Sequence, residues 1–80
     1  PDTVLAYKYK ESGKKKSANG DQQGAIDDYT KAIYFNPNYD TAYHNRGVVK
    51  AAIGDYNGAI SDYNKAIEII RKYVFRRTWI

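Results

Sequence analysis

The 80-residue chain contains no cysteine and no methionine, and only two prolines and one histidine. The absence of cysteine excludes disulfide bridges and thiolate metal sites. No apolar run approaches the roughly 20 residues that a membrane-spanning helix needs, and no signal-peptide pattern opens the chain. We therefore expect one domain over residues 1–80 with no membrane segment, and a cytoplasmic location as the default.

The charges are distributed unevenly along the chain. Residues 1–20 carry five basic and two acidic side chains, residues 21–70 carry four and seven, and residues 71–80 carry four basic ones and no acid. Lysines 14–16 and the basic tail, together with nine tyrosines, are side chains that can contact phosphates and stack on bases. A nucleic-acid-binding module is therefore the alternative function, although the sequence has no RNA-binding motif and we do not expect nucleic acid as the partner.

An internal repeat of 34 residues is the strongest pattern in the sequence. When residues 9–33 are aligned with residues 43–67, 14 of the 25 pairs are identical, against roughly one or two expected from average composition. A period of this length indicates stacked supersecondary units, which form binding surfaces more often than active sites. His44 has no partner at metal-ligand spacing, and no nucleophile–base set can be assembled. We expect no enzyme activity, no cofactor and no metal site.

Each copy of the repeat contains apolar residues at the spacing of one helical face. The pattern i, i+1, i+4, i+7, i+8 predicts an amphipathic helix in each copy, and no strand is needed. The second copy extends this face through Ile70. The two sets are Ala25, Ile26, Tyr29, Ala32 and Ile33, and Ala59, Ile60, Tyr63, Ala66 and Ile67.

Turn residues divide the chain into four helices, which we place at about residues 3–18, 22–35, 39–53 and 56–76. Gly20 and Gly54 suit the turns, and Asp21 and Asp55 can each cap the helix that follows. A proline ends the second helix, and we expect Asn38 to cap the third. The fold class is therefore all-α.

Several polar and aromatic residues are placed by the same helical periodicity. Glycines that recur inside the helices suggest close helix–helix approach, namely Gly13, Gly24, Gly47 and Gly58. Adjacent Asp27 and Asp28 point about 100° apart, and we expect Asp28 and Asp62 to lie on a solvated face. We expect Tyr29 and Tyr63 in the core, and Tyr39 and Tyr56 packed between the two units.

Period, helix pairing and residue types together resemble the tetratricopeptide repeat, whose unit is two antiparallel helices, A and B. The first unit supplies its pattern at Tyr9, Gly13, Ala25, Tyr29, Ala32 and Pro37, and the second at Tyr43, Gly47, Ala59, Tyr63 and Ala66. The resemblance covers residues 6–71. It implies an antiparallel helix-hairpin repeat fold, an α-α superhelix, with repeat 1 at residues 6–39, repeat 2 at residues 40–70 and a C-terminal extension at residues 71–80.

The chain departs from this family pattern at several positions. Ser12 and Arg46 stand where a large apolar residue is expected, and Lys16 and Lys50 stand where an aromatic is expected, which predicts loosely packed A helices. Arg71 replaces the second closing proline, so the last helix should continue, and residues 71–80 could form the capping helix that such arrays need. The apolar tail cluster predicts either a longer repeat array or self-association, through Tyr73, Val74, Phe75, Trp79 and Ile80.

In this family helix A lines the inner concave face, so the resemblance implies a non-catalytic scaffold or adaptor whose groove binds a protein or peptide. A groove with lysine, asparagine and histidine side chains suits a peptide that carries acidic groups. Lys10 and Asn45 match two of the five positions of the two-carboxylate clamp of one family subgroup, too few to predict that clamp. The predicted groove residues are Tyr7, Lys10, Lys14, Thr41, His44, Asn45 and Val48.

Overall fold

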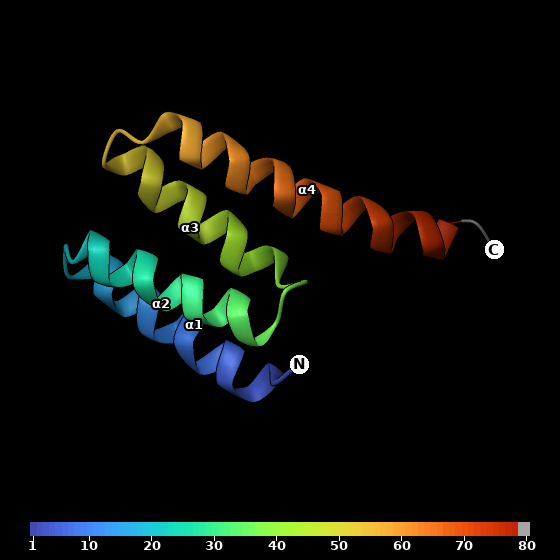
Figure 1. Ribbon diagram of the computed structural model, residues 1–80, viewed down its shortest axis with the longest axis horizontal. Helices are drawn as coiled ribbons and strands as arrows, with labels where there is room; N and C mark the ends of the chain where they lie inside the picture. Colours follow the sequence, from blue (N-terminus) through green and yellow to red (C-terminus); the bar gives the residue numbers. More distant parts are fainter. Residues whose placement is uncertain (79–80) are drawn as a thin grey trace.

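The computed structural model describes the backbone of residues 1–78 and the side chains of residues 1–74. Four helices follow one another, α1 (Thr3–Ala18), α2 (Gln22–Phe35), α3 (Asp40–Ala52) and α4 (Tyr56–Thr78), and no strand occurs in this part of the chain. They form two antiparallel hairpins, α1 with α2 and α3 with α4, that pack through α2 and α3 (Figure 1). The predicted all-α hairpin fold is confirmed, and the predicted helix ends differ from the observed ones by at most two residues.

Aspartates begin three of the four helices. The backbone N–H groups of Leu5, Gly24 and Gly58 each donate to the carboxylate three residues earlier, at Asp2, Asp21 and Asp55, over 2.9–3.0 Å. Such caps satisfy amide groups that have no partner inside the helix. The expected cap at Asn38 is wrong, because α3 begins after Tyr39, whose side chain makes no capping bond. The Asn36 side chain instead accepts from the Asn38 backbone N–H and shapes the turn.

One glycine in each hairpin allows its two helices to pack closely. A Cβ atom at Gly13 would lie 2.7 Å from the Tyr29 ring, and one at Gly47 would lie 2.8 Å from the Tyr63 ring. The expected close approach therefore occurs at these two positions. At Gly24 and Gly58 the space is taken by the capping aspartates of the same helices, so the expected helix–helix reason is wrong there. Gly20 and Gly54 have φ values of +85° and +87°, which turns require and glycine adopts readily.

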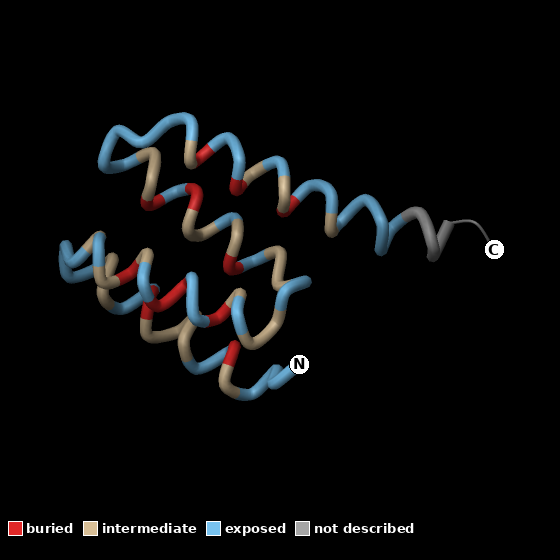
Figure 2. Tube along the Cα trace, in the orientation of Figure 1, coloured by how far each residue is buried: buried red, intermediate tan, exposed pale blue. Residues whose placement is uncertain are grey.

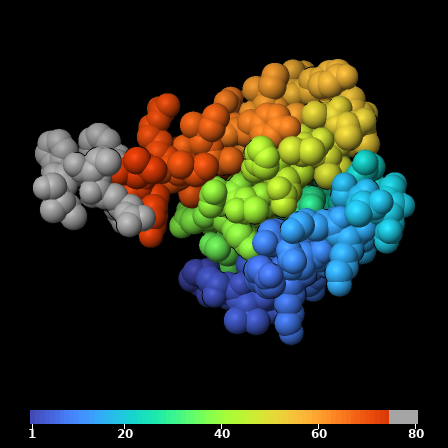
Figure 3. Space-filling view, turned by 180° about the vertical axis from the view of Figure 1, so that it is seen from behind, coloured from blue at the N-terminus to red at the C-terminus, as the bar shows by residue number. Residues whose placement is uncertain are grey.

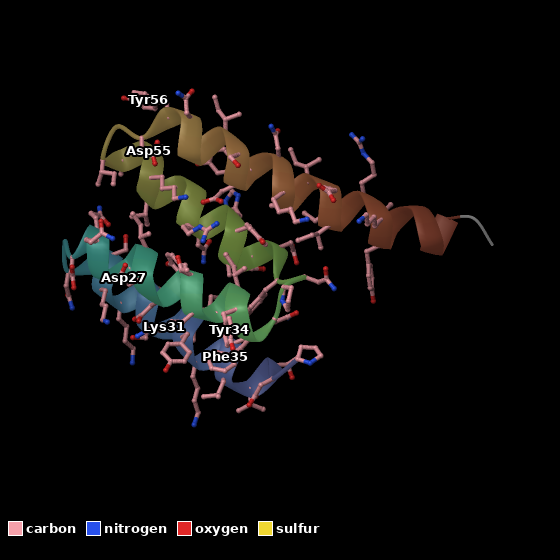
Figure 4. All side chains as sticks on the ribbon, in the orientation of Figure 1. Asp27, Lys31, Tyr34, Phe35, Asp55 and Tyr56 are labelled. Carbon is pink, nitrogen blue, oxygen red and sulfur yellow. The ribbon has the colours of Figure 1, made fainter. Side chains whose placement is uncertain are left out.

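The core lies between the hairpins and consists mainly of small residues. Tyr29 is its largest buried side chain, at 2% exposure, and it packs in one cluster with Ala25 and Val49. Figure 2 shows the buried positions on the facing sides of the helices. Two residues of the predicted apolar face in the second copy are not buried, since Ile60 and Ile67 are 56% and 52% exposed. Tyr56 is also exposed rather than packed between the units, and its side chain points away from the helices in Figure 4.

Asp28 and Asp62 are buried at 3% exposure, so the expectation of a solvated face is wrong. Asp62 accepts two hydrogen bonds from the Arg46 guanidinium, at 2.8 and 2.7 Å, and its carboxylate lies 3.2 Å from the Lys50 Nζ. In the first hairpin, Ser12 donates to Asp28 at 2.5 Å, and the Lys16 Nζ lies 3.1 Å from the same carboxylate.

These contacts explain the departures from the family pattern. Each of these four polar residues contacts the buried aspartate of its own hairpin, so the layer expected to be loosely packed is instead held by hydrogen bonds and ion pairs. The stability of the fold therefore depends on the charge state of the two aspartates. A buried carboxylate needs such partners, because an unpaired charge in this position would be costly.

The two aspartates should make stability fall at low pH. Burial raises the pKa of Asp62, but hydrogen bonds and charge from Arg46 and Lys50 outweigh burial and lower it below the ordinary 3.8; Ser12 and Lys16 do the same for Asp28. A lowered folded-state pKa stabilises the fold above the ordinary value, and this stabilisation is lost as pH falls through the folded value. We expect the urea midpoint, followed by circular dichroism, to change little from pH 7 to 5 and to drop below about pH 4. A midpoint that stays constant down to pH 2.5 would contradict this.

The last helix is the longest of the four described helices. It continues past Arg71 to Thr78, as the missing proline predicted, and it contacts α3 but neither α1 nor α2. Its C-terminal end extends beyond the other helices (Figure 1). Within residues 1–78, no helix combines the length and apolar character needed to cross a membrane.

Candidate functional site

The predicted groove residues occupy corresponding positions on α1 and α3. Tyr7 corresponds to Thr41, Lys10 to His44 and Lys14 to Val48, each pair separated by the 34-residue period. Spacing of three and four residues keeps the members of each set on one side of their helix. The two helices contact each other, and in Figure 3 they lie next to each other on the face seen from behind. We call this face the α1/α3 surface.

Exposure varies widely among these residues. Tyr7 and Val48 are 54% and 47% exposed, Thr41 and His44 are exposed, and the Lys14 side chain is 57% exposed. The Lys10 side chain is only 14% exposed. Tyr7, Lys14 and Val48 are thus open to a ligand, whereas Lys10 is largely enclosed.

Lys10 is held by its neighbours on α1 and at the start of α3. Its Nζ lies 3.3 Å from a Glu11 carboxylate oxygen, 4.5 Å from the centre of the Tyr7 ring and 5.9 Å from that of Tyr39. Burial alone lowers the pKa of Lys10, but Glu11 and the Tyr39 hydroxyl outweigh burial and raise it. Lys10 therefore keeps its charge and uses it within the protein.

Glu11 is the residue of this surface whose role sequence reasoning missed. It lies on α1 between two predicted groove residues, and its carboxylate is 3.3 Å from the Lys10 Nζ and 3.5 Å from the Lys14 Nζ. The ammonium group of Lys10, followed by the charge of Lys14, lowers the pKa of Glu11. The i, i+3 spacing of Glu11 and Lys14 was the available signal. Glu11 reduces the positive charge offered to an acidic ligand.

Asn45 has a structural partner. Its side chain lies beside the hydroxyl of Tyr29, which belongs to α2 of the first hairpin. Burial is the main reason that the pKa of Tyr29 is raised. The Asn45 amide thus contacts the first hairpin, and a ligand would have to compete with this contact.

Thr41 and His44 line a separate hollow between α3 and α4. The hollow has a volume of about 520 Å³ and is lined by Asp40, Thr41, His44, Tyr63, Ala66, Ile67 and Ile70. The His44 ring lies 5.5 Å from the Tyr63 ring, between centres. The predicted site is therefore divided into a polar part around Lys10 and Lys14 on α1 and a more apolar part between α3 and α4.

A second hollow lies where the loop after α2 meets α4. Its volume is about 650 Å³, and it shares Asp40 and Ile70 with the first one. Tyr73 and Val74, predicted for self-association, line it and are 65% and 49% exposed. Trp79 and Ile80, and the side chain of Phe75, lie outside the described residues.

Lysines 14–16 do not form a continuous cationic surface. Successive helical residues point about 100° apart, and two of the three lysines are paired, Lys14 with Glu11 and Lys16 with Asp28. The phosphate contacts expected from this run would therefore fall mainly to Lys15. Among the described residues, no group of three His, Cys, Asp or Glu side chains is placed to hold a metal ion.

Comparison with protein families agrees with this geometry. A family model described as "TPR repeat" matches residues 13–54, and one described as "Tetratricopeptide repeat" matches residues 40–73. No curated protein matches the sequence. Repeats of this type generally mediate protein–protein interactions and are generally non-catalytic. The first match spans more than half of the sequence, and the chain belongs to the tetratricopeptide repeat family.

Proposed function

We propose that this chain is an adaptor with two protein-binding surfaces. The α1/α3 surface binds a peptide segment of another protein, and the exposed side of α4 binds a second copy of the chain. The observation that carries the first part is the pairing of exposed residues across the 34-residue period on two adjacent helices. Regularly spaced side chains on rigid helices suit an extended or helical ligand.

The chemistry of the α1/α3 surface favours a peptide of mixed character. Tyr7 and Val48 offer exposed apolar area, and Lys14 offers the most accessible ammonium group of the predicted set. Since Glu11 already neutralises part of the lysine charge, a densely acidic peptide gains less than the sequence suggested. We propose an apolar peptide with an acidic group placed near Lys14.

Peptide selection on the intact chain tests this proposal. A random peptide library is selected against the wild-type chain, and selected peptides are measured by fluorescence anisotropy against two double variants. Tyr7→Ala/Lys14→Glu alters the proposed surface, whereas Tyr34→Ala/Lys15→Glu makes the same changes at other exposed positions, Tyr34 being 78% exposed. We expect the first variant to weaken binding at least about tenfold, the size of one important contact, and the second to leave it unchanged.

Two results would contradict the proposal. The selected peptides could bind both double variants with equal affinity, or the chain could select no peptide while it binds single-stranded DNA with an affinity that falls steeply with salt. The second result would favour the nucleic-acid alternative.

A further inference from the structure

A row of apolar residues on α4 follows a heptad spacing, and all of its members except the half-buried Tyr63 are exposed. Steps of four and three residues alternate along the helix from Tyr56 to Val74, which is the 3.5-residue period of a coiled coil. Ile60, Ile67 and Ile70 in this row are 56%, 52% and 46% exposed. We call the row the α4 seam, and it consists of Tyr56, Ile60, Tyr63, Ile67, Ile70 and Val74.

The α4 seam lies beside the face that α4 buries on α3. Ala59, Asp62 and Ala66 belong to that buried face, and each is at most 4% exposed. At 100° per residue the centres of the two faces are separated by roughly 90° around the helix. One helix can therefore bury both faces at once, against α3 on one side and against another helix on the other.

The first hairpin shows what such a row does when a helix covers it. The corresponding residues on α2 include Ile26, Tyr29 and Ile33, identical to Ile60, Tyr63 and Ile67 of the seam. There α3 packs against α2, Tyr29 is 2% exposed and Ile26 is partly buried. On α4, Ile60 and Ile67 are left open and Tyr63 is half-buried because, among the helices within residues 1–78, α4 contacts only α3.

A second copy cannot cover the seam by stacking its first hairpin there. In such a head-to-tail stack, α1 would take the place that α3 takes on α2. The positions equivalent to the buried Ala42 and Val49 of α3 are Lys8 and Lys15 on α1, and both are exposed. Two lysines would then be buried without partners, which is costly.

The length of the seam points to another α4 as the covering helix. The seam runs from residue 56 to residue 74, about 27 Å at 1.5 Å per residue. The 13 residues of α3 would span only about 20 Å of it. A second α4 has the same length and the same heptad spacing, and it therefore covers the full seam.

We propose that two copies associate through their α4 seams as an antiparallel coiled coil. This inference rests on the self-association part of the proposed function and assigns its geometry. In the antiparallel register every seam residue meets another: Tyr56 meets the partner's Val74, Ile60 meets the partner's Ile70, and Tyr63 meets the partner's Ile67. Each tyrosine then packs on a smaller β-branched side chain, so large and small residues alternate across the interface.

Charge also favours the antiparallel orientation. Residues 71–80 carry four basic side chains and no acid. A parallel pair would place two such tails side by side, and it would stack Tyr56 and Tyr63 on their own copies. The antiparallel pair separates the basic tails by the length of the seam. Like charges at close range destabilise an interface, so the parallel alternative is disfavoured.

The oligomeric state of the full chain tests the seam. We expect sedimentation velocity to show a monomer–dimer equilibrium that shifts with concentration, and Ile67→Lys to raise the dimer dissociation constant about a hundred-fold, because two buried isoleucines are lost per dimer. Ile53→Lys is the matched control, since Ile53 is 51% exposed against 52% for Ile67 and lies outside the seam. A chain that stays monomeric at every soluble concentration would overturn both the self-association and its geometry. Equal weakening by both variants would overturn the seam.

Thiol crosslinking tests the orientation, because the chain has no cysteine of its own. Ile60→Cys and Ile70→Cys are prepared separately, and each variant alone and an equimolar mixture are treated with a short bifunctional maleimide. The antiparallel register predicts a covalent dimer that forms mainly in the mixture. Efficient crosslinking of each variant alone, with no gain on mixing, would overturn the antiparallel geometry while the self-association stands.

Discussion

The Asp62→Ala variant is expected to lose a large part of its free energy of unfolding at 25 °C. Asp62 is 3% exposed and accepts a two-fold hydrogen bond from Arg46, whose side chain is 16% exposed. Removal of the carboxylate leaves the guanidinium without its partner in a largely buried position, a change that costs roughly 3–5 kcal/mol. The whole free energy of unfolding of an 80-residue domain is about 4–12 kcal/mol, so one substitution removes a large part of it.

Urea unfolding followed by circular dichroism measures this effect, and related aspartates supply the controls. Asp28→Ala should cost less, since its partners are the neutral Ser12 hydroxyl and Lys16, whose side chain is 43% exposed and can turn to solvent. Asp27 is exposed, and Asp27→Ala should change the free energy of unfolding by no more than about 0.5 kcal/mol. Equal costs at all three positions would show that the buried pairs do not govern stability.

A double variant separates the loss of the pair from the loss of packing. Arg46→Leu/Asp62→Leu removes the guanidinium and the carboxylate, leaves Lys50 to turn its ammonium group to solvent, and places an apolar side chain where the family pattern expects one. Replacement of a buried ion pair by apolar residues is often neutral or stabilising. We expect this variant to recover most of the stability lost in Asp62→Ala, and to show a smaller fall in stability below pH 4 than the wild-type chain. Failure to recover would mean that the pair has a role apolar packing cannot replace.

The helices and turns could be predicted because their signals are local. Asp21, Gly54 and the apolar spacing act within a few residues of the chain, and the predicted helix ends hold to within two residues. The start of α3 differs because the Asn36 side chain bonds the Asn38 backbone and leaves Asn38 outside the helix start. That competition between two neighbouring asparagines depends on their side-chain conformations, which the sequence does not specify.

For the buried aspartates, the helical periodicity indicated a buried position, whereas the residue type suggested an exposed one. Asp28 is three residues after Ala25 and four before Ala32, so it belongs to the buried stripe by position. The solvated face was expected because a carboxylate is normally exposed. The compensating signal lay on the facing helix, where polar residues one turn apart replace apolar ones in both repeats, as Ser12 with Lys16 and Arg46 with Lys50.

The sequence predicts which faces of the helices carry the proposed groove residues, but it does not predict how their side chains pair. The 34-residue period places Tyr7 with Thr41 and Lys14 with Val48 on corresponding faces of α1 and α3. The enclosure of Lys10 by Glu11 and Tyr39 depends on tertiary contacts. The exposure of Ile60 likewise depends on whether a helix covers it, which a repeat pattern alone does not state.

Tyr29 and Tyr63 occupy corresponding positions in the two repeats, and we expect the loss of the Tyr29 ring to lower the free energy of unfolding strongly. Tyr29→Ala should lower the free energy of unfolding by about 3–5 kcal/mol. The Tyr29 ring is 2% exposed and fills the space left by Gly13, so its removal leaves a cavity that nearby groups do not fill. The Tyr29 hydroxyl lies beside the Asn45 side chain, so Tyr29→Phe should lower the free energy of unfolding by no more than about 1 kcal/mol, the net value of one hydrogen bond. Together these variants divide the contribution of Tyr29 between the packing of its ring and the link between hairpins.

Tyr63→Ala is the matched comparison for Tyr29→Ala. Tyr63 packs on Gly47 as Tyr29 packs on Gly13, but it is half-buried and lines the hollow beside His44. At a concentration where the chain is monomeric, we expect a cost of about 1–3 kcal/mol, because part of the ring already contacts water. At a concentration where dimers form, the cost should rise toward that of Tyr29→Ala, since the partner's Ile67 then covers the ring. A loss of stability in Tyr63→Ala that does not depend on protein concentration would contradict the seam. Equal losses for Tyr29→Ala and Tyr63→Ala in the monomer would show that the open hairpin face is covered by another part of the same chain.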